Sequence, residues 1–141
     1  MNNFIKNFFI FLFFFNFSNL LFAGNDYFYE GKKLFDLEKY KDSKIKFEKD
    51  IVFNPKNENS YLYLAKIFNK EKNIDLEENN LNTVILLNPK NEEAIYLLTV
   101  LNIKKSNFTK AKNLIDIFES ICIEICSSKN ELLKKLENSS K

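Results

Sequence analysis

Apolar residues recur along most of this chain at spacings of three and four, which is the period of one face of a helix. A clear stripe is formed by Tyr61, Leu64, Ala65 and Phe68, and similar stripes precede and follow it. These segments lack the strict alternation of apolar and polar residues that indicates strands. The pattern therefore predicts an all-α protein, with helices over residues 25–37, 41–53, 59–71, 75–87, 93–105 and 109–124.

One five-residue string, Asn-Pro-Lys-Asn-Glu, occurs twice, at 54–58 and at 88–92. Proline lacks a backbone N–H and disfavours helix at the residue before it, so each string ends one helix. The second asparagine suits an N-cap, and the glutamate after it suits the positive end of a new helix. Pro55 and Pro89 are 34 positions apart, which indicates a helix-turn-helix unit of that length.

The same period aligns Gly31, Ala65 and Thr99, where the two helices of a hairpin would cross. On these positions the chain resembles the tetratricopeptide repeat (TPR) family over residues 24 to about 125. The resemblance implies a right-handed α-solenoid of about three units, at 24–57, 58–91 and 92–125. Three departures predict less regular packing of the second and third units. Glu77 and Phe118 stand where small residues are usual, and the third unit lacks its terminal proline.

Residues 127–141 follow the last unit and carry the signal of a helix start. Ser128 and Glu131 have the spacing of a capping box and precede an apolar stripe of leucines. We predict a final helix over about 129–138. It would cap the solenoid, since the end of a repeat array needs a polar outer face.

The first 23 residues differ from the rest of the chain. A basic start with Lys6 leads into an unbroken apolar run over 8–15, and small residues follow at Ala23 and Gly24. This order predicts a signal peptide cleaved after Ala23 and a periplasmic or secreted product, similar to the small exported TPR proteins of bacteria. The alternative is an uncleaved inner-membrane anchor, although the clean run is shorter than the roughly 20 residues that span a bilayer.

Composition narrows the function classes. The chain has 141 residues and a formal net charge of +2, which becomes +1 without residues 1–23 because these hold one lysine and no acid. The charges are interspersed and every basic residue is lysine, so nucleic-acid binding is not expected. Without histidine there is no Ser-His or Cys-His pair, and two glycines cannot build a Gly-rich phosphate loop. We therefore expect no enzyme, no cofactor and no metal site.

The two cysteines, Cys122 and Cys126, lie four positions apart. Cysteines often pair in exported proteins. On a regular helix, however, their Cβ atoms would be about 5–6 Å apart, whereas a disulfide needs roughly 3.5–4.5 Å. A bond thus requires the helix to unwind between them. A disulfide, two buried free thiols, and a thiol or redox role for the pair all stay open.

TPR proteins bind peptides or protein segments in a groove lined by the first helix of each hairpin. The resemblance therefore implies a protein partner, held in an apolar groove that could also bind a second copy of the chain. Lys32 and Lys66 resemble lysines that clamp a terminal carboxylate in some family members; the alternative is that they are ordinary solvated side chains. By matching positions, the groove candidates are Phe28, Lys32, Phe35, Leu62, Lys66, Asn69, Tyr96 and Val100.

Overall fold

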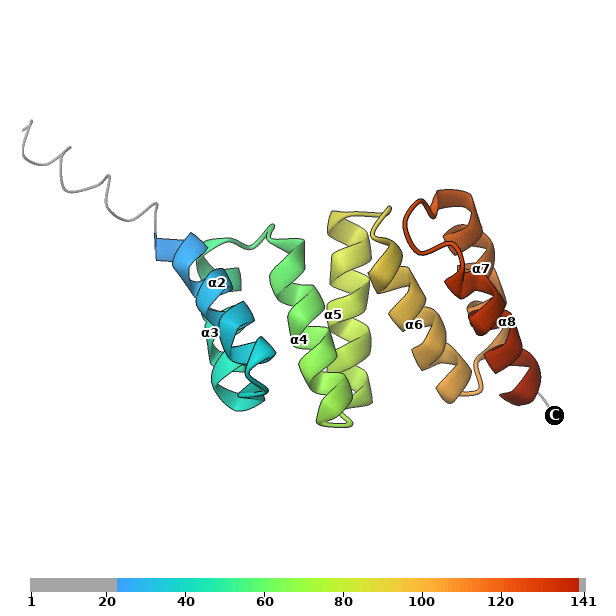
Figure 1. Ribbon diagram of the computed structural model, residues 1–141, viewed down its shortest axis with the longest axis horizontal. Coiled ribbons are helices and arrows are strands. Elements are labelled where there is room, and N and C mark those ends of the chain that lie inside the picture. The colour runs from blue at the N-terminus through green and yellow to red at the C-terminus, as the bar shows by residue number, and fades with distance from the viewer. Residues whose placement is uncertain (1–22, 140–141) are drawn as a thin grey trace, which may run out of the picture. The chain divides into compact units, whose positions relative to one another are not determined.

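The computed structural model describes residues 23–139, and within this range the protein is all-α, as predicted. Figure 1 shows helices paired as antiparallel hairpins in chain order. The predicted signal peptide lies outside the described residues except for Ala23. No helix within 23–139 is both long and apolar enough to cross a membrane. The helices are α2 (Ala23–Asp36), α3 (Tyr40–Phe53), α4 (Glu58–Lys70), α5 (Ile74–Leu87), α6 (Glu92–Lys104), α7 (Phe108–Ile121) and α8 (Ser128–Ser139).

The observed helix bounds follow the predicted ones within two residues, with one exception. The sequence pattern predicts a helix over 109–124, but the corresponding helix α7 ends at Ile121. The backbone of Cys122 is extended, with φ −62° and ψ 139°, so the helix stops there. The prediction was wrong at this point because the apolar residues Ile123 and Ile125 continue the helical spacing beyond the end of the helix.

Asparagine is the N-cap residue of α4, α5, α6 and α7, and in the first three of these helices its side chain accepts a hydrogen bond from a backbone N–H. The Asn91 side chain accepts a hydrogen bond from the N–H of Ala94 at 2.9 Å, and Asn57 accepts one from the N–H of Asn59 at 3.2 Å. Asn73 caps α5 in the same way. The two N-caps expected from the repeated string, Asn57 and Asn91, are thus confirmed, and they satisfy amides that a helix start leaves unpaired.

The turn inside each hairpin uses a left-handed residue that is not glycine. Glu38, Lys72 and Ser106 have φ values of 59°, 58° and 57°, and they are spaced by the 34-residue period. In the second turn the N–H of Asn73 donates to the carbonyl of Phe68 at 2.9 Å. This bond spans five residues and belongs to the Schellman motif, in which a left-handed residue closes the end of a helix.

The chain forms two compact units, divided after Pro55. In the first unit α2 packs on α3, and Gly31 lies where the two helices meet. The Ser43 hydroxyl donates to the carbonyl of Gly31 at 2.8 Å. A Cβ added to Gly31 would lie 2.8 Å from Cε1 of the buried Phe47. Only glycine fits this position without displacing that ring.

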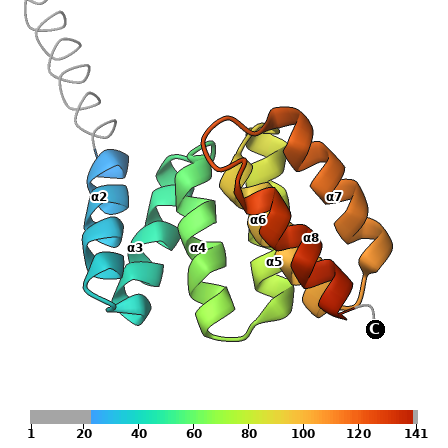
Figure 2. The ribbon, with the colours of Figure 1, turned by 45° about the vertical axis from the view of Figure 1, so that its right-hand side comes forward.

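The second unit contains α4 to α8 around one apolar core. Leu132 and Leu136 of α8 are buried in this core, and α8 packs against both α6 and α7 (Figure 2). This is the arrangement expected of a capping helix. The Glu131 carboxylate, predicted to belong to a capping box, accepts a hydrogen bond from Tyr96 at 3.0 Å and pairs with Lys135.

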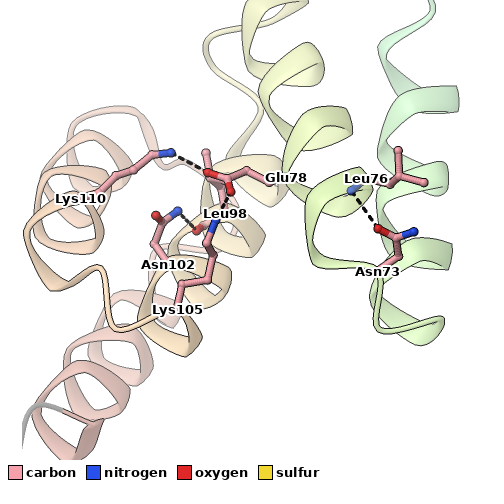
Figure 3. A network of polar contacts seen from close by, with 7 residues as sticks. All are labelled: Asn73, Leu76, Glu78, Leu98, Asn102, Lys105 and Lys110. Atoms are coloured by element: carbon pink, nitrogen blue, oxygen red, sulfur yellow. Dashed lines mark hydrogen bonds and ion pairs between the residues drawn. The ribbon is translucent and has the colours of Figure 1, made fainter.

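Two adjacent glutamates of α5 hold the second unit together in different ways. Glu77, expected to loosen the packing, is buried and accepts a hydrogen bond from the Asn69 amide at 2.8 Å. Glu78 pairs with Lys105 and, at 2.8 Å, with Lys110 (Figure 3). Glu78 thereby ties α5 to the end of α6 and the start of α7.

Candidate functional site

The second unit contains a cleft of about 710 Å³, which we call the α6 cleft. The first helices of two successive hairpins contribute Leu62 and Tyr96, which are 34 positions apart and were both predicted as groove residues. The repeat explains this, because equivalent positions of stacked hairpins point to the same side. The cleft is lined by Asn59 and Leu62 of α4, Asn88, Lys90 and Asn91 before α6, Glu92, Glu93 and Tyr96 of α6, and Glu124, Ile125 and Ser128 after α7.

Tyr96 is anchored at the wall of the cleft by contacts on both of its ends. Its ring packs against Phe118, with the ring centroids 6.5 Å apart, and its hydroxyl donates to Glu131. Burial, and then the hydrogen bond to Glu131, raise the pKa of Tyr96 above its ordinary value. The Tyr96 hydrogen bond, followed by that from Lys135, lowers the pKa of Glu131. The tyrosine therefore presents an oriented, neutral ring to the cleft.

Lys66, the candidate carboxylate clamp of α4, already faces a carboxylate of the chain. Its Nζ lies 2.7 Å from Glu93, a residue of the α6 cleft, and 4.9 Å from the ring centroid of Tyr63. An anionic ligand group would have to compete with Glu93 for this lysine. The pairing makes Lys66 a poor match for the free lysine that a clamp requires.

The remaining candidates of the second unit do not line the cleft. Asn69 donates its amide to Glu77 within the α4–α5 hairpin. Val100 is half-buried and packs against the apolar core. Asn69 therefore has a packing role in this unit that the sequence did not indicate.

Three candidates, Phe28, Lys32 and Phe35, belong to the first unit. The Phe28 ring packs against Phe47 with the centroids 5.9 Å apart, and Lys32 pairs with Asp36 at 3.0 Å. The Phe35 ring meets Tyr40 edge-on at 5.3 Å. Phe28 and Phe35 thus pack within the α2–α3 hairpin, whereas Lys32 pairs within α2.

The glutamate that starts each of α4 and α6 has a role that sequence reasoning missed. Glu58 accepts hydrogen bonds from the side-chain amides of Asn88, at 2.8 Å, and Asn91, at 3.2 Å. The sequence suggested only a favourable interaction with the helix dipole. The observed contact instead joins the start of one repeat to the connection that begins the next. The signal was present, because the string Asn-Pro-Lys-Asn-Glu repeats as a whole.

Glu92 makes the corresponding contact one repeat later. Its carboxylate accepts hydrogen bonds from the backbone N–H groups of Ile123, at 2.7 Å, and Ile125, at 3.0 Å, with Glu124 between them. The N–H of Ile125, and then those of Ile123 and Glu124, lower the pKa of Glu92. A carboxylate held by consecutive backbone N–H groups is a strong acceptor site that favours the charged form.

Cys122 and Cys126 form a disulfide at this connection, with their Cα atoms 5.2 Å apart. The extended backbone at Cys122 supplies the unwinding that a bond between these residues requires. Among the residues that the structure describes, no group of histidine, cysteine and acidic side chains is arranged to hold a metal ion.

No protein-family model and no curated protein sequence matches the chain. Solved structures do resemble it. The TPR2B domain of yeast Sti1 in complex with an Hsp70 peptide is 18% identical, with a TM-score of 0.72 over 83% of this chain and 95% of that one. The first TPR domain of Spaghetti (RPAP3), bound to the HSP90 peptide SRMEEVD, is 18% identical, with a TM-score of 0.74 over 84% and 94%.

A bacterial structure shows the same likeness. The Yersinia enterocolitica type III secretion chaperone SycD, in complex with a peptide of the translocator YopD, is 13% identical, with a TM-score of 0.71 over 82% of this chain and 91% of that one. At such low identity the likeness establishes the fold alone. The predicted fold class is confirmed: the protein is an all-α solenoid of the tetratricopeptide-repeat type.

Proposed function

We propose that this chain, which has the tetratricopeptide-repeat fold, is a protein-interaction adaptor that binds a segment of a partner protein in the α6 cleft. The observation that carries the proposal is the cleft itself, which is lined by Leu62 and Tyr96 at equivalent positions of two successive hairpins. Concave sites with apolar walls and a few oriented polar groups are typical of binding sites. The similar domains of Sti1, RPAP3 and SycD were each solved with a peptide.

The charges of the cleft favour a segment that is not acidic. Its lining includes one lysine, Lys90, and three glutamates. Glu92 is engaged by backbone N–H groups and Glu93 by Lys66. An acidic peptide such as SRMEEVD would bring further negative charge to this lining. We therefore propose an occupant with one or two apolar side chains between uncharged or basic residues, in place of the acidic group that the sequence suggested.

A crosslinking experiment in cells of the native host tests this function. A photoreactive side chain at Asn59, which lines the cleft, should give a discrete adduct with one partner. The same group at Asn82, an exposed asparagine of α5 outside the cleft, serves as the matched control and should give none. An adduct of twice the chain mass would instead identify a second copy of the protein. Equal adducts from both positions, or none from either, would contradict the proposal.

Binding to the captured partner provides a second measurement. A synthetic peptide of the crosslinked segment should bind Asn59→Arg at least about tenfold more weakly than the wild-type protein, because the longer charged side chain fills the cleft. Asn82→Arg adds the same charge to α5 and should bind as the wild type does. Equal loss in both variants would point to a general effect of charge and not to the cleft.

We further propose that the adaptor works in the periplasm after removal of residues 1–23. The support is the order of a basic start, an apolar run and small residues in this segment. Protein recovered from a periplasmic extract should begin at or near Gly24 on N-terminal sequencing. Recovery from the inner-membrane fraction with Met1 still present would support the anchored alternative.

A further inference from the structure

The last connection of the second unit replaces a repeated element of the fold. Residues 122–126, Cys-Ile-Glu-Ile-Cys, stand 34 positions after Asn-Pro-Lys-Asn-Glu at 88–92. Each connection holds a glutamate from the start of the first helix of the hairpin before it. At 88–92 the donors are the side-chain amides of two asparagines, which hold Glu58. At 122–126 there is no asparagine, and another group has to hold Glu92.

The backbone takes over the role of the missing amides. Three consecutive N–H groups, of Ile123, Glu124 and Ile125, point to the Glu92 carboxylate. Ile123 stands where Pro89 stands in the earlier connection, and proline has no N–H to donate. A proline at position 123 could not make this hydrogen bond, so the contact with Glu92 requires that the third unit lacks the terminal proline of the other units. The disulfide joins the two ends of the same five residues and limits the conformations that the loop can adopt.

This disulfide-closed loop also forms part of the α6 cleft. Glu124 and Ile125 line the cleft together with Ser128, the first residue of α8, and Ile125 packs against the apolar core. From α8, Glu131 then accepts the hydrogen bond of Tyr96 on the wall of the cleft. The geometry of the loop therefore determines two parts of the lining, the loop itself and the start of the capping helix.

The bond is placed where a reductant can reach it. Cys126 is exposed and Cys122 is half-buried, so an incoming thiolate meets Cys126 first. A thiolate of a dithiol would attack Sγ of Cys126 and form a mixed disulfide, and Cys122 would leave as a thiolate that takes up a proton. The second thiol of the dithiol then displaces Cys126. The protein gains two electrons and two protons, and the dithiol becomes a disulfide.

We propose that the Cys122–Cys126 disulfide is a thiol-sensitive clasp of the α6 cleft: the oxidised loop holds Glu92 and completes the wall, and reduction by a dithiol releases the loop and weakens binding. The effect on binding depends on the proposed function. The release of Glu92 does not, so the two can be tested separately.

Nuclear magnetic resonance on the protein without residues 1–23 tests the clasp directly. On addition of dithiothreitol, the amide signals of residues 123–125 should lose their hydrogen-bonded shifts, and the titration midpoint of the Glu92 carboxyl carbon should rise. Reoxidation should restore both. The side-chain amide of Asn69, which binds Glu77 within the α4–α5 hairpin and does not line the cleft, serves as the internal control and should not move. Unchanged signals at 123–125 in protein shown by mass to be reduced would overturn the clasp.

Binding is measured with a probe peptide selected from a random phage-displayed library against the oxidised protein. Its Kd should rise about tenfold or more with dithiothreitol, and Cys122→Ser/Cys126→Ser should bind weakly with or without reductant. If no peptide binds the oxidised form while the Glu92 signals respond, the proposed function fails and the clasp stands as a structural device without a binding role. If peptides bind equally in both states, the proposal of a clasp on the cleft is overturned.

Discussion

At the scale of single residues, two adjacent glutamates of α5 show that neighbouring positions of one helix can have pKa values shifted in opposite directions. Glu77 points into the hairpin, where burial raises its pKa despite the opposing effects of Asn69 and Lys104. Glu78 points toward the next hairpin, where Lys105 and then Lys110 lower its pKa. Consecutive positions of a helix are about 100° apart, so they meet different neighbours.

Substitution of these two glutamates by glutamine should shift stability in opposite directions. In the unfolded chain the pKa of Glu77 is near its ordinary value of 4.5, and in the folded chain this pKa is higher. The wild type therefore loses stability as the pH rises from the unfolded-state pKa through the folded-state pKa. Glu77→Gln keeps an oxygen for Asn69, and it should be more stable than the wild type at pH 7 by up to about 1 kcal/mol. The difference should shrink below about pH 4.

Glu78→Gln should instead be less stable at pH 7, by about 1 kcal/mol, since both lysines lose a charged partner. Because the folded-state pKa of Glu78 is lowered, its contribution is present above the unfolded pKa and is lost as the pH falls through the folded value. Urea unfolding of both variants and the wild type at pH 7 and pH 3 measures the differences. A shift of the same sign at pH 7 would show that the two environments are not opposite.

Gly31 provides the second residue-scale test. Gly31→Leu places a side chain where even a Cβ would lie 2.8 Å from the ring of Phe47, so the first hairpin must move apart. Overpacking of this kind costs about 1–3 kcal/mol. Lys33→Leu adds the same side chain on the exposed side of α2 and should change stability little. Unfolding in urea compares the two variants. A urea midpoint of the Gly31 variant equal to that of the wild type would exclude the close helix crossing.

At the scale of the elements, the three hairpin turns share a geometry that their residues do not favour. Glu38, Lys72 and Ser106 all adopt the left-handed conformation at the end of a first helix, where glycine is usual. A residue with a Cβ is strained there by roughly 1–2 kcal/mol. The neighbouring helices impose the turn, and the strain is tolerated at each repeat.

Glycine should therefore stabilise the protein at one lysine and destabilise it at another. Lys72→Gly removes the strain, and after the larger loss of backbone entropy we expect a gain of about 0.5–1 kcal/mol. Lys112→Gly changes an exposed lysine inside α7 and should cost about 1 kcal/mol. The free energies of unfolding in urea give both values. A loss at both positions would mean that the left-handed turn is not retained in solution.

At the scale of the whole molecule, the C-terminal helix completes the core of the second unit. Leu132 is fully buried between α8 and the preceding hairpin, whereas Leu133, the next residue, is 38% exposed. The end of a repeat array would otherwise leave an apolar surface open to water. The cap thus has the same role as a further repeat, although its sequence does not match the repeat.

A pair of alanine substitutions tests the role of the cap. Leu132→Ala leaves a cavity in the core and should cost about 2–5 kcal/mol. Leu133→Ala removes a side chain of equal size that is partly exposed, and it should cost less, about 1 kcal/mol. Thermal unfolding followed by circular dichroism distinguishes them, and similar losses would show that α8 does not pack through Leu132.

Much of the fold could be predicted from local signals. The N-caps Asn57 and Asn91, the crossing glycine Gly31 and nearly all helix bounds follow from periodicity and from the chemistry of proline, asparagine and glycine. The candidate site follows less directly from the sequence. The groove candidates Leu62 and Tyr96 line the same cleft, but the pairing of Lys66 with Glu93 depends on side chains that meet only when two hairpins stack.

The amino-acid order by itself determined the all-helical hairpins and their 34-residue period, because helix propensity, caps and apolar stripes act over a few neighbouring residues. Only the tertiary structure decided which charged side chains form ion pairs and which carboxylate accepts hydrogen bonds from which loop. Glu92 shows the difference: nothing near it in the chain indicates a partner, and its donors lie more than thirty residues away, at the disulfide-closed loop. Contacts of that range depend on how the helices pack, which local pattern does not encode.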